Sequence, residues 1–255
     1  MTPGNAKQLD RSALELMVRK LEYRGKFSAE DRAALLALPH HVKRFEPHHY
    51  IVRERDEATH VCLMVSGFSV RHKFVGAGFR QIVGLHMKGE MVDLQNSLLG
   101  KADHSVQMLT AGQVAMIPRE EIVRIAFERP AVGKALWIDT LVDGSMFREW
   151  IANTGRRDAR ARIAHLFCEF GLRLKHAGLA EEQDYTLPMN QEQIADSTGL
   201  TPVHVNRMIK SLEADGLISR VSPRAIKIGD WKLLADAGDF DSSYLHMRRD
   251  DPVLA

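Results

Sequence analysis

Residues 189–219, MNQEQIADSTGLTPVHVNRMIKSLEADGLIS, constrain the fold of this chain more than any other segment. The pattern predicts two short helices joined by a tight turn, over 191–197 and 202–214. Gly199 gives the turn a backbone conformation that residues with side chains avoid. Thr201 is a good N-cap residue, and Pro202 occupies the first helical position, where its missing N–H is not needed. Two helices in this arrangement are typical of a helix-turn-helix unit.

Apolar positions separate an inner face of this unit from an outer one. The helices are predicted to pack on each other through Ile194, Ala195, Leu200, Val205, Ile209 and Leu212. The residues predicted to contact DNA, at the edges or on the outer face, are Thr201, Pro202, Val203, His204, Asn206, Arg207 and Lys210. Because arginine can bond bidentately to guanine and asparagine to adenine, this outer face suits the major groove.

A short β-hairpin is predicted directly after the second helix, in ISRVSPRAIKI. Ser222-Pro223 marks its turn, so the hairpin forms a wing, and Arg220, Arg224 and Lys227 are placed to reach DNA phosphates. The stretch 202–227 holds five basic and two acidic residues, whereas the whole chain has a net charge of only +2. The expected basic surface is therefore local.

The first half of the chain has a different pattern. From Val42 to about Ile117, short β-type runs alternate with turns, which predicts a small sandwich or barrel. An opening helical stretch over about 13–38 precedes it. Within that stretch, Ser28 to Asp31 resembles a capping box at a helix start.

A long helix is predicted from Pro130 to about Asn153, because proline suits a first turn and apolar residues recur throughout. Asn153-Thr154-Gly155 is predicted to end it. A helix this long and apolar must bury two faces, one on its own domain and one on a partner. The residues that we expect in a dimer interface are Leu136, Thr140, Gly144, Phe147 and Ile151.

These elements together resemble the Crp/Fnr superfamily of bacterial transcription regulators, over roughly residues 28–230 and most strongly in QEQIADSTGLTPVHVNRMIKSLEADGLI. The resemblance implies an α+β fold with an N-terminal double-stranded β-roll (jelly-roll-like), a long dimerisation helix and a C-terminal winged helix-turn-helix. The expected parts are N-terminal helices with a cyclic-nucleotide-binding-like sensor roll (1–129), a dimerisation helix with hinge (130–155), the winged helix-turn-helix (156–232) and an extension without an assigned role (233–255).

The resemblance also implies partners. Family members bind two-fold-related half-sites of double-stranded DNA as homodimers, with recognition helices about 34 Å apart. RNA polymerase is then a further expected partner. Arg207 stands at the family's guanine-reading arginine. Val203 stands where many members have a glutamate, so a different preferred half-site is expected.

The same comparison implies where an effector pocket would lie: Asp93, Leu94, His104, Ser105, Phe147 and Arg148. Asp93-Leu94 replace a Gly-Glu pair of cAMP sensors, and His104-Ser105 replace an Arg-Ser pair. Leu94 cannot accept a hydrogen bond from ribose, and Asp93 repels phosphate. We therefore expect a regulator that does not depend on cAMP, with an unknown small-molecule effector or none. A cyclic-nucleotide receptor with an atypical binding cassette is the alternative.

Other cofactors and other protein classes find little support in the sequence. Two cysteines, Cys62 and Cys168, are too few for a four-cysteine iron–sulfur cluster and suit a reducing cytosol. Cys62, His72 and His86 are imaginable haem ligands, but we expect ordinary β-roll residues, no metal and no cofactor. An enzyme on a cupin-like barrel would need an HxH…E pattern that is missing. No stretch reaches the roughly 20 apolar residues of a membrane span, so we expect a cytoplasmic protein without membrane contact.

Overall fold

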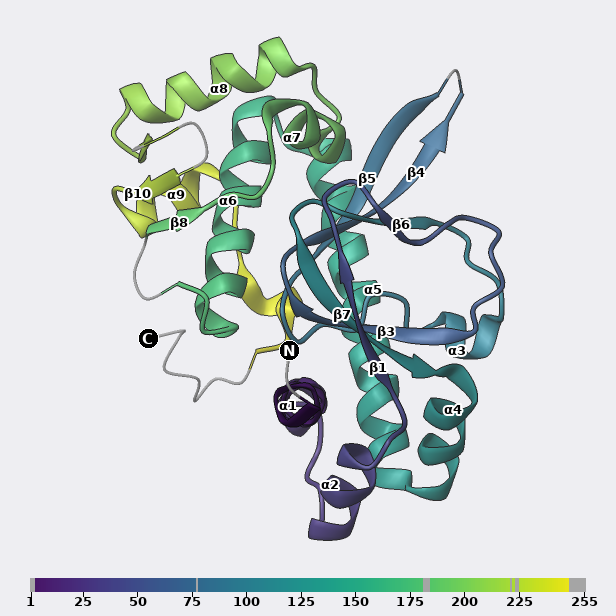
Figure 1. Cartoon of the computed structure of the whole chain (residues 1–255). Helices are drawn as coiled ribbons and strands as arrows, with labels where there is room; N and C mark the ends of the chain where they lie inside the picture. Colours follow the sequence, from purple (N-terminus) through teal and green to yellow (C-terminus); the bar gives the residue numbers. More distant parts are fainter. Residues whose placement is uncertain (1–2, 77, 181–183, 221, 223–224, 248–255) are drawn as a thin grey trace. The chain divides into compact units, whose positions relative to one another are not determined.

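The computed structural model describes residues 3–76, 78–180, 184–220, 222 and 225–247. Contacts divide the chain into two compact units (Figure 1). The first unit comprises Met1–Lys73 and Gly84–Asp143, and the second comprises Phe74–Val83 and Gly144–Ala255. Among the described residues, no helix combines the length and the apolar character that crossing a bilayer requires.

Two antiparallel sheets form the β-roll. Its strands are β1 (His41–Phe45), β2 (Tyr50–Val52), β3 (His60–Ser66), β4 (Ser69–Val75), β5 (Phe79–His86), β6 (Ser105–Met108) and β7 (Gly112–Pro118). The strand orders are β1-β7-β3 and β2-β6-β4-β5. Buried side chains from both sheets, among them Met64 of β3 and Val106 of β6, share one hydrophobic cluster. The sandwich predicted from the alternating pattern is confirmed.

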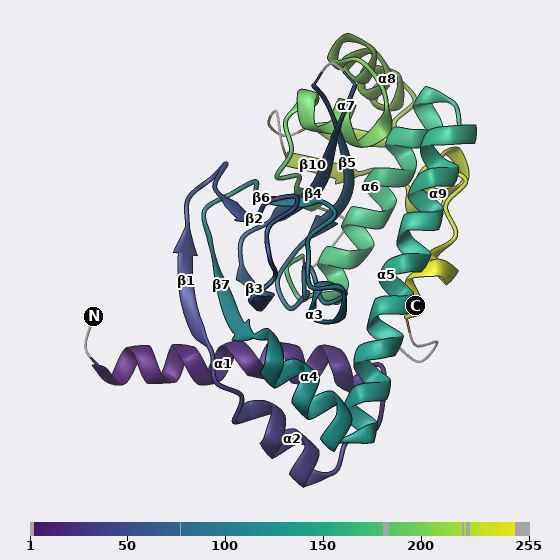
Figure 2. The same ribbon diagram turned by 90° about the vertical axis from the view of Figure 1, so that its right-hand side faces the viewer.

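The helices α1 (Pro3–Glu22), α2 (Ala29–Leu36) and α4 (Arg119–Glu128) lie at one end of these strands (Figure 2). The short helix α3 (Asn96–Leu99) precedes β6, and the long helix α5 (Pro130–Arg156) follows α4. The predicted capping box is present, since the Ser28 hydroxyl accepts from the Asp31 N–H and the Asp31 carboxylate accepts from the Ser28 N–H. This cap divides the predicted opening stretch into two helices.

The long helix α5 does not end where the sequence predicted. It continues through Gly155 to Arg156, and the next helix begins only after Asp158. The carboxylate of Asp158 accepts hydrogen bonds from the N–H groups of Arg160 and Ala161. A strong N-cap is therefore what separates the two helices, and the Asn-Thr-Gly sequence is not.

The second unit is built around α6. Its elements are α6 (Ala159–His176), β8 (Asp184–Thr186), α7 (Gln191–Thr198), α8 (Pro202–Ala214), β9 (Ile218–Arg220), β10 (Ala225–Ile228), α9 (Trp231–Ala237) and the 3₁₀ helix η1 (Ser242–Leu245). The small sheet has the order β8-β10-β9. The sequence did not predict β8. The fold class expected from the sequence, a roll, a long helix and a winged helix-turn-helix, is confirmed.

Candidate functional site

The helix-turn-helix has the predicted caps. Asn190 and Gln193 form a capping box at the start of α7, and Gly199 ends α7 in the left-handed region with φ 66°. The Thr201 hydroxyl accepts from the His204 N–H, and Pro202 occupies the first turn of α8. These local signals fix the turn that connects α7 to α8.

One side of α8 packs and the other is open. Val205, Ile209 and Leu212 are buried against the rest of the unit. Thr201, Pro202 and Val203 are exposed, Val203 to 81%, and His204 and Asn206 are half-buried. Arg207 and Lys210 are exposed, and neither has an ion-pair partner among the described residues. Figure 1 shows α8 along an outer edge of the second unit, above α7 and α6. Two uncompensated cations on an open helix face are suited to a nucleic acid.

Two of the predicted wing cations, Arg220 and Lys227, form ion pairs with carboxylates of the second unit. The Arg220 guanidinium forms a two-point ion pair with Glu213, through Nε–Oε1 and Nη2–Oε2 distances of 2.7 Å. Lys227 lies 3.2 Å from the Asp184 carboxylate of β8. Arg224 lies outside the described residues. Arg220 therefore joins β9 to α8 through Glu213, and its contact with DNA phosphate stays a prediction.

Sequence reasoning missed two arginines that support the helix-turn-helix. Arg162 of α6 donates from Nη1 to the Thr198 carbonyl (3.0 Å), where α7 ends. Cations at a helix C-terminus are favoured by the helix dipole. Arg160 forms an ion pair with Asp215 after the end of α8. The basic run RRDARAR, residues 156–162, is the sequence signal that could have indicated them.

The exposed face of α5 is a regular seam. Exposed residues recur along it at Lys134, Trp137, Leu141, Arg148, Ile151 and Gly155, and with the half-buried Gly144 they are spaced three and four residues apart. The three large apolar members, Trp137, Leu141 and Ile151, are 69%, 56% and 70% exposed. This alternation is the heptad spacing of a coiled-coil seam.

The seam corrects part of the predicted dimer interface. Leu136 is 5% exposed and belongs to the hydrophobic core of the first unit, so it is not available to a partner. Thr140 is half-buried and donates to the Leu136 carbonyl within its own helix. Phe147 and Gly144 are half-buried, whereas Ile151 is exposed on the seam.

The roll interior holds the first part of the expected effector pocket. Asp93 is fully buried, and its Oδ1 accepts from the Cys62 N–H at 3.2 Å. Burial raises the pKa of Asp93 to about 6. Leu94 belongs to the apolar core, and the Ser105 hydroxyl accepts from the Glu54 N–H. Phe147 and Arg148 lie on the part of α5 that belongs to the second unit.

His104 is the second buried titratable group of this set. It is 4% exposed, and its Nδ1 lies 2.6 Å from the Asp103 carboxylate. Burial, reinforced by the Arg71 charge, lowers the pKa of His104 to about 4. The imidazole is therefore neutral near pH 7.

The expected effector set differs from the groups that the resemblance assigns to a cyclic-nucleotide site. His104, neutral near pH 7, stands at the position of the phosphate-binding arginine, and the Asp93 carboxylate is buried. Leu94, at the position of the ribose-binding glutamate, is apolar and packed. The buried thiol of Cys62, whose pKa burial raises, lies 3.6 Å from the Met116 sulfur.

The depressed pKa of His104 predicts a defined loss of stability in acid. The unfolded chain takes up a proton below pH 6.5, whereas the folded chain does so only near pH 4. Stability must therefore fall as pH falls through this window. We expect His104→Gln to remove about 2 kcal/mol of the loss between pH 7.5 and 5, as measured by urea unfolding. The exposed His49→Gln is the control, and equal pH profiles for His104→Gln and the unmodified chain would refute the assignment.

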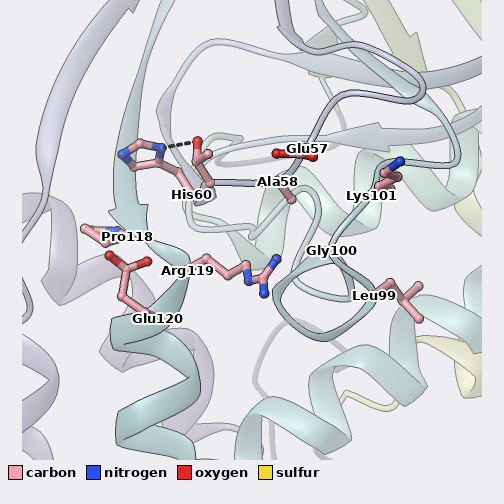
Figure 3. A pocket seen from close by; sticks show the side chains of 10 residues that line it. Glu57, Ala58, His60, Leu99, Gly100, Lys101, Pro118, Arg119 and Glu120 are labelled. Carbon is pink, nitrogen blue, oxygen red and sulfur yellow. Dashed lines mark hydrogen bonds between the residues drawn. The ribbon is translucent and has the colours of Figure 1, made fainter.

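A pocket of about 820 Å³ lies on the surface of the first unit (Figure 3). Its walls are the segments 57–60, 99–101 and 118–120. Figure 3 shows Glu57, Lys101 and Arg119 within it, so charges of both signs line the same space. It shares no residue with the expected effector set and therefore does not replace it.

Comparisons with known proteins match both halves of the chain. Residues 42–129 match the model of the cyclic nucleotide-binding domain, and residues 161–237 match that of the Crp-like helix-turn-helix domain. The chain is 28% identical over 193 residues to the transcriptional activator protein FnrL of Cereibacter sphaeroides, covering 74% of this chain and 77% of the relative. It is 28% identical over 195 residues to the nitrogen fixation regulation protein FixK of Bradyrhizobium diazoefficiens, covering 75% and 81%.

A solved structure agrees with the fold. FixK2 from Bradyrhizobium japonicum superposes with a TM-score of 0.70 at 22% identity, covering 78% of this chain and 98% of that one. Both domain matches, in the order roll then helix-turn-helix, agree with the elements described above. The chain belongs to the Crp/Fnr superfamily of transcriptional regulators.

Proposed function

We propose that the protein is a homodimeric, sequence-specific DNA-binding regulator of transcription that inserts α8 into the major groove and does not depend on cAMP. The open face of α8 carries this proposal, because Arg207 and Lys210 are exposed and uncompensated there while the wing cations Arg220 and Lys227 are paired internally. Thr201, Pro202, Val203, His204 and Asn206 complete the proposed contact surface, together with Arg224.

The open heptad seam of α5 supports the dimer. A second copy of the same seam would cover Trp137, Leu141 and Ile151, which a monomer leaves in water. Gly144 supports a close approach of two backbones at the middle of the seam. Two copies would present two α8 helices to half-sites about one helical turn of DNA apart.

The remaining partners follow from the family. The relatives are named transcriptional activators, so RNA polymerase is the second macromolecular partner that we propose. A regulator that binds the bacterial chromosome works in the cytoplasm, and nothing in the proposal requires catalysis.

Selection of binding sites from random double-stranded DNA tests the proposal. The expected product is a two-fold-related sequence with half-site centres about 10 base pairs apart. Enrichment of no sequence, or of one unrepeated half-site, would contradict it. Native mass spectrometry of the same preparation should show a dimer.

Lys210 is expected to contact phosphate. Lys210→Ala should weaken binding to selected and scrambled DNA alike, and it should reduce the slope of log affinity against log salt by about 1 per protomer. Fluorescence anisotropy at several salt concentrations measures both. The control is Lys232→Ala on α9, a lysine that is 87% exposed beside Asp236. An unchanged salt slope for Lys210→Ala would place this lysine away from the backbone.

A further inference from the structure

Arg71 is a fully buried arginine. It lies on β4, inside the roll, and is 2% exposed. Arginines are almost never buried unless they are paired, because removing the charge from water is costly. A buried arginine in the interior of a family's ligand-binding roll therefore requires an explanation.

Its hydrogen bonds join three separate parts of the first unit. Nη1 donates to Oδ2 of Asp143 on α5 at 2.8 Å, and Nη2 donates to the carbonyl of Val92. Asp143 is the last residue of the first unit, and the rest of α5, from Gly144 onward, belongs to the second unit. The ion pair thus fixes α5 to the roll at the residue where the two units divide.

The groups around Arg71 leave no cation for an anionic ligand. His86, Asp93 and His104 are near enough to interact with its charge, and burial lowers the pKa of both histidines. Among the described residues, the Arg71 charge then interacts with the carboxylates of the buried Asp93 and of Asp143, whose side chain is 30% exposed. Glu90, 3.6 Å from His86, adds negative charge. An incoming phosphate would meet an excess of carboxylates.

A second set of ion pairs holds the same side of α5. Asp139, one turn before Asp143, lies 3.0 Å from Lys20 of α1 and 3.3 Å from Arg24, which follows α1. Two residues correspond to about 200° of rotation around a helix. The two aspartates therefore lie opposite Trp137 and Leu141, and their ion pairs set the rotation at which α5 presents its open seam.

We infer that the Arg71–Asp143 ion pair replaces a bound effector. It holds α5 in the rotation that presents the seam to a second copy, and it excludes cyclic nucleotides from the roll. The inference rests on the proposed function, since it names how that dimer is kept competent for DNA. The regulator is then active without a small molecule in the roll.

The test uses Asp143→Asn, Arg71→Gln and the double variant in the full chain. Sedimentation measures the dimer dissociation constant, and anisotropy measures affinity for the selected DNA with and without millimolar cAMP or cGMP. The control is Arg124→Gln, which removes an exposed arginine paired with Glu121 and Glu128 on α4. Circular dichroism and the thermal midpoint verify folding. If Arg71→Gln does not fold, Asp143→Asn decides, because the Asp143 side chain is 30% exposed.

Each single variant should raise the dissociation constants of the dimer and of the DNA complex by about tenfold or more. The double variant should bind no more weakly than whichever single variant binds more weakly, as expected for residues that act through their contact. The control should remain within about twofold. Cyclic nucleotides should change neither the affinity nor the thermal midpoint of the unmodified protein. Unaltered dimerisation of Asp143→Asn, or a response to either nucleotide, would overturn the inference. An unmodified chain that selects no DNA would refute the proposed function, while sedimentation would still decide the role of the pair.

Discussion

Arg207→Ala is expected to abolish discrimination between the selected DNA and a scrambled sequence while leaving the thermal midpoint unchanged. Arg207 is exposed on α8, and it supports no other described residue through an ion pair, so its removal has little reason to disturb the fold. A bidentate arginine–guanine contact is worth about 1–3 kcal/mol of discrimination, and a dimer makes two such contacts. Competition binding with both DNA molecules at fixed salt measures the ratio.

Arg207→Lys separates charge from geometry. Lysine keeps the positive charge but lacks the planar fork, so the variant should retain affinity for scrambled DNA and still lose most discrimination. If Arg207→Ala instead weakened both sequences equally, Arg207 would be a phosphate contact and the reading of bases would lie elsewhere on α8. Val203, which is 81% exposed, would then be the next residue to substitute.

The parts of the fold that the sequence predicted well are those that local chemistry determines. Caps and turns depend on a few neighbouring residues, so Ser28, Gly199, Thr201 and Pro202 could be placed from the sequence alone. The alternation of apolar residues likewise predicted the roll, because it reports one buried face per strand.

The parts that the sequence did not predict depend on long-range contacts. Both faces of α5 are apolar, and only the burial of Leu136 in the first unit's core shows that Trp137 and Leu141 form the open seam. Likewise, the sequence does not show that Arg220 pairs with Glu213. Charge counts along a sequence do not reveal which cations are already neutralised by a residue that the fold brings near.

The C-terminal extension, to which the sequence assigned no role, contributes to a buried network in the second unit. The Glu169 carboxylate of α6 is 1% exposed and accepts from Tyr244 Oη at 2.7 Å. It also accepts from Trp150 Nε1 of α5 at 3.0 Å and from Arg173 at 2.8 Å. Tyr244 and Leu245 pack with Leu172 in one hydrophobic cluster. One carboxylate therefore joins the last turns of α5, the core helix α6 and η1.

Glu169→Ala should destabilise the protein by about 3–5 kcal/mol, because it removes at once the buried carboxylate that accepts from Trp150, Arg173 and Tyr244. Tyr244→Phe removes the hydrogen bond to the Glu169 carboxylate and the 3.2 Å contact with His165 Nε2, and should cost about 1.5–3 kcal/mol. Glu213→Ala breaks a pair of similar geometry whose side chains are 24% and 25% exposed, and should cost about 1 kcal/mol at most. Urea unfolding of the three variants measures the loss in the free energy of unfolding for each and ranks the three losses. A loss for Glu169→Ala no larger than that for Glu213→Ala would mean that the extension rests on α6 through apolar contacts alone, and that α5 is fastened to α6 by something other than this carboxylate.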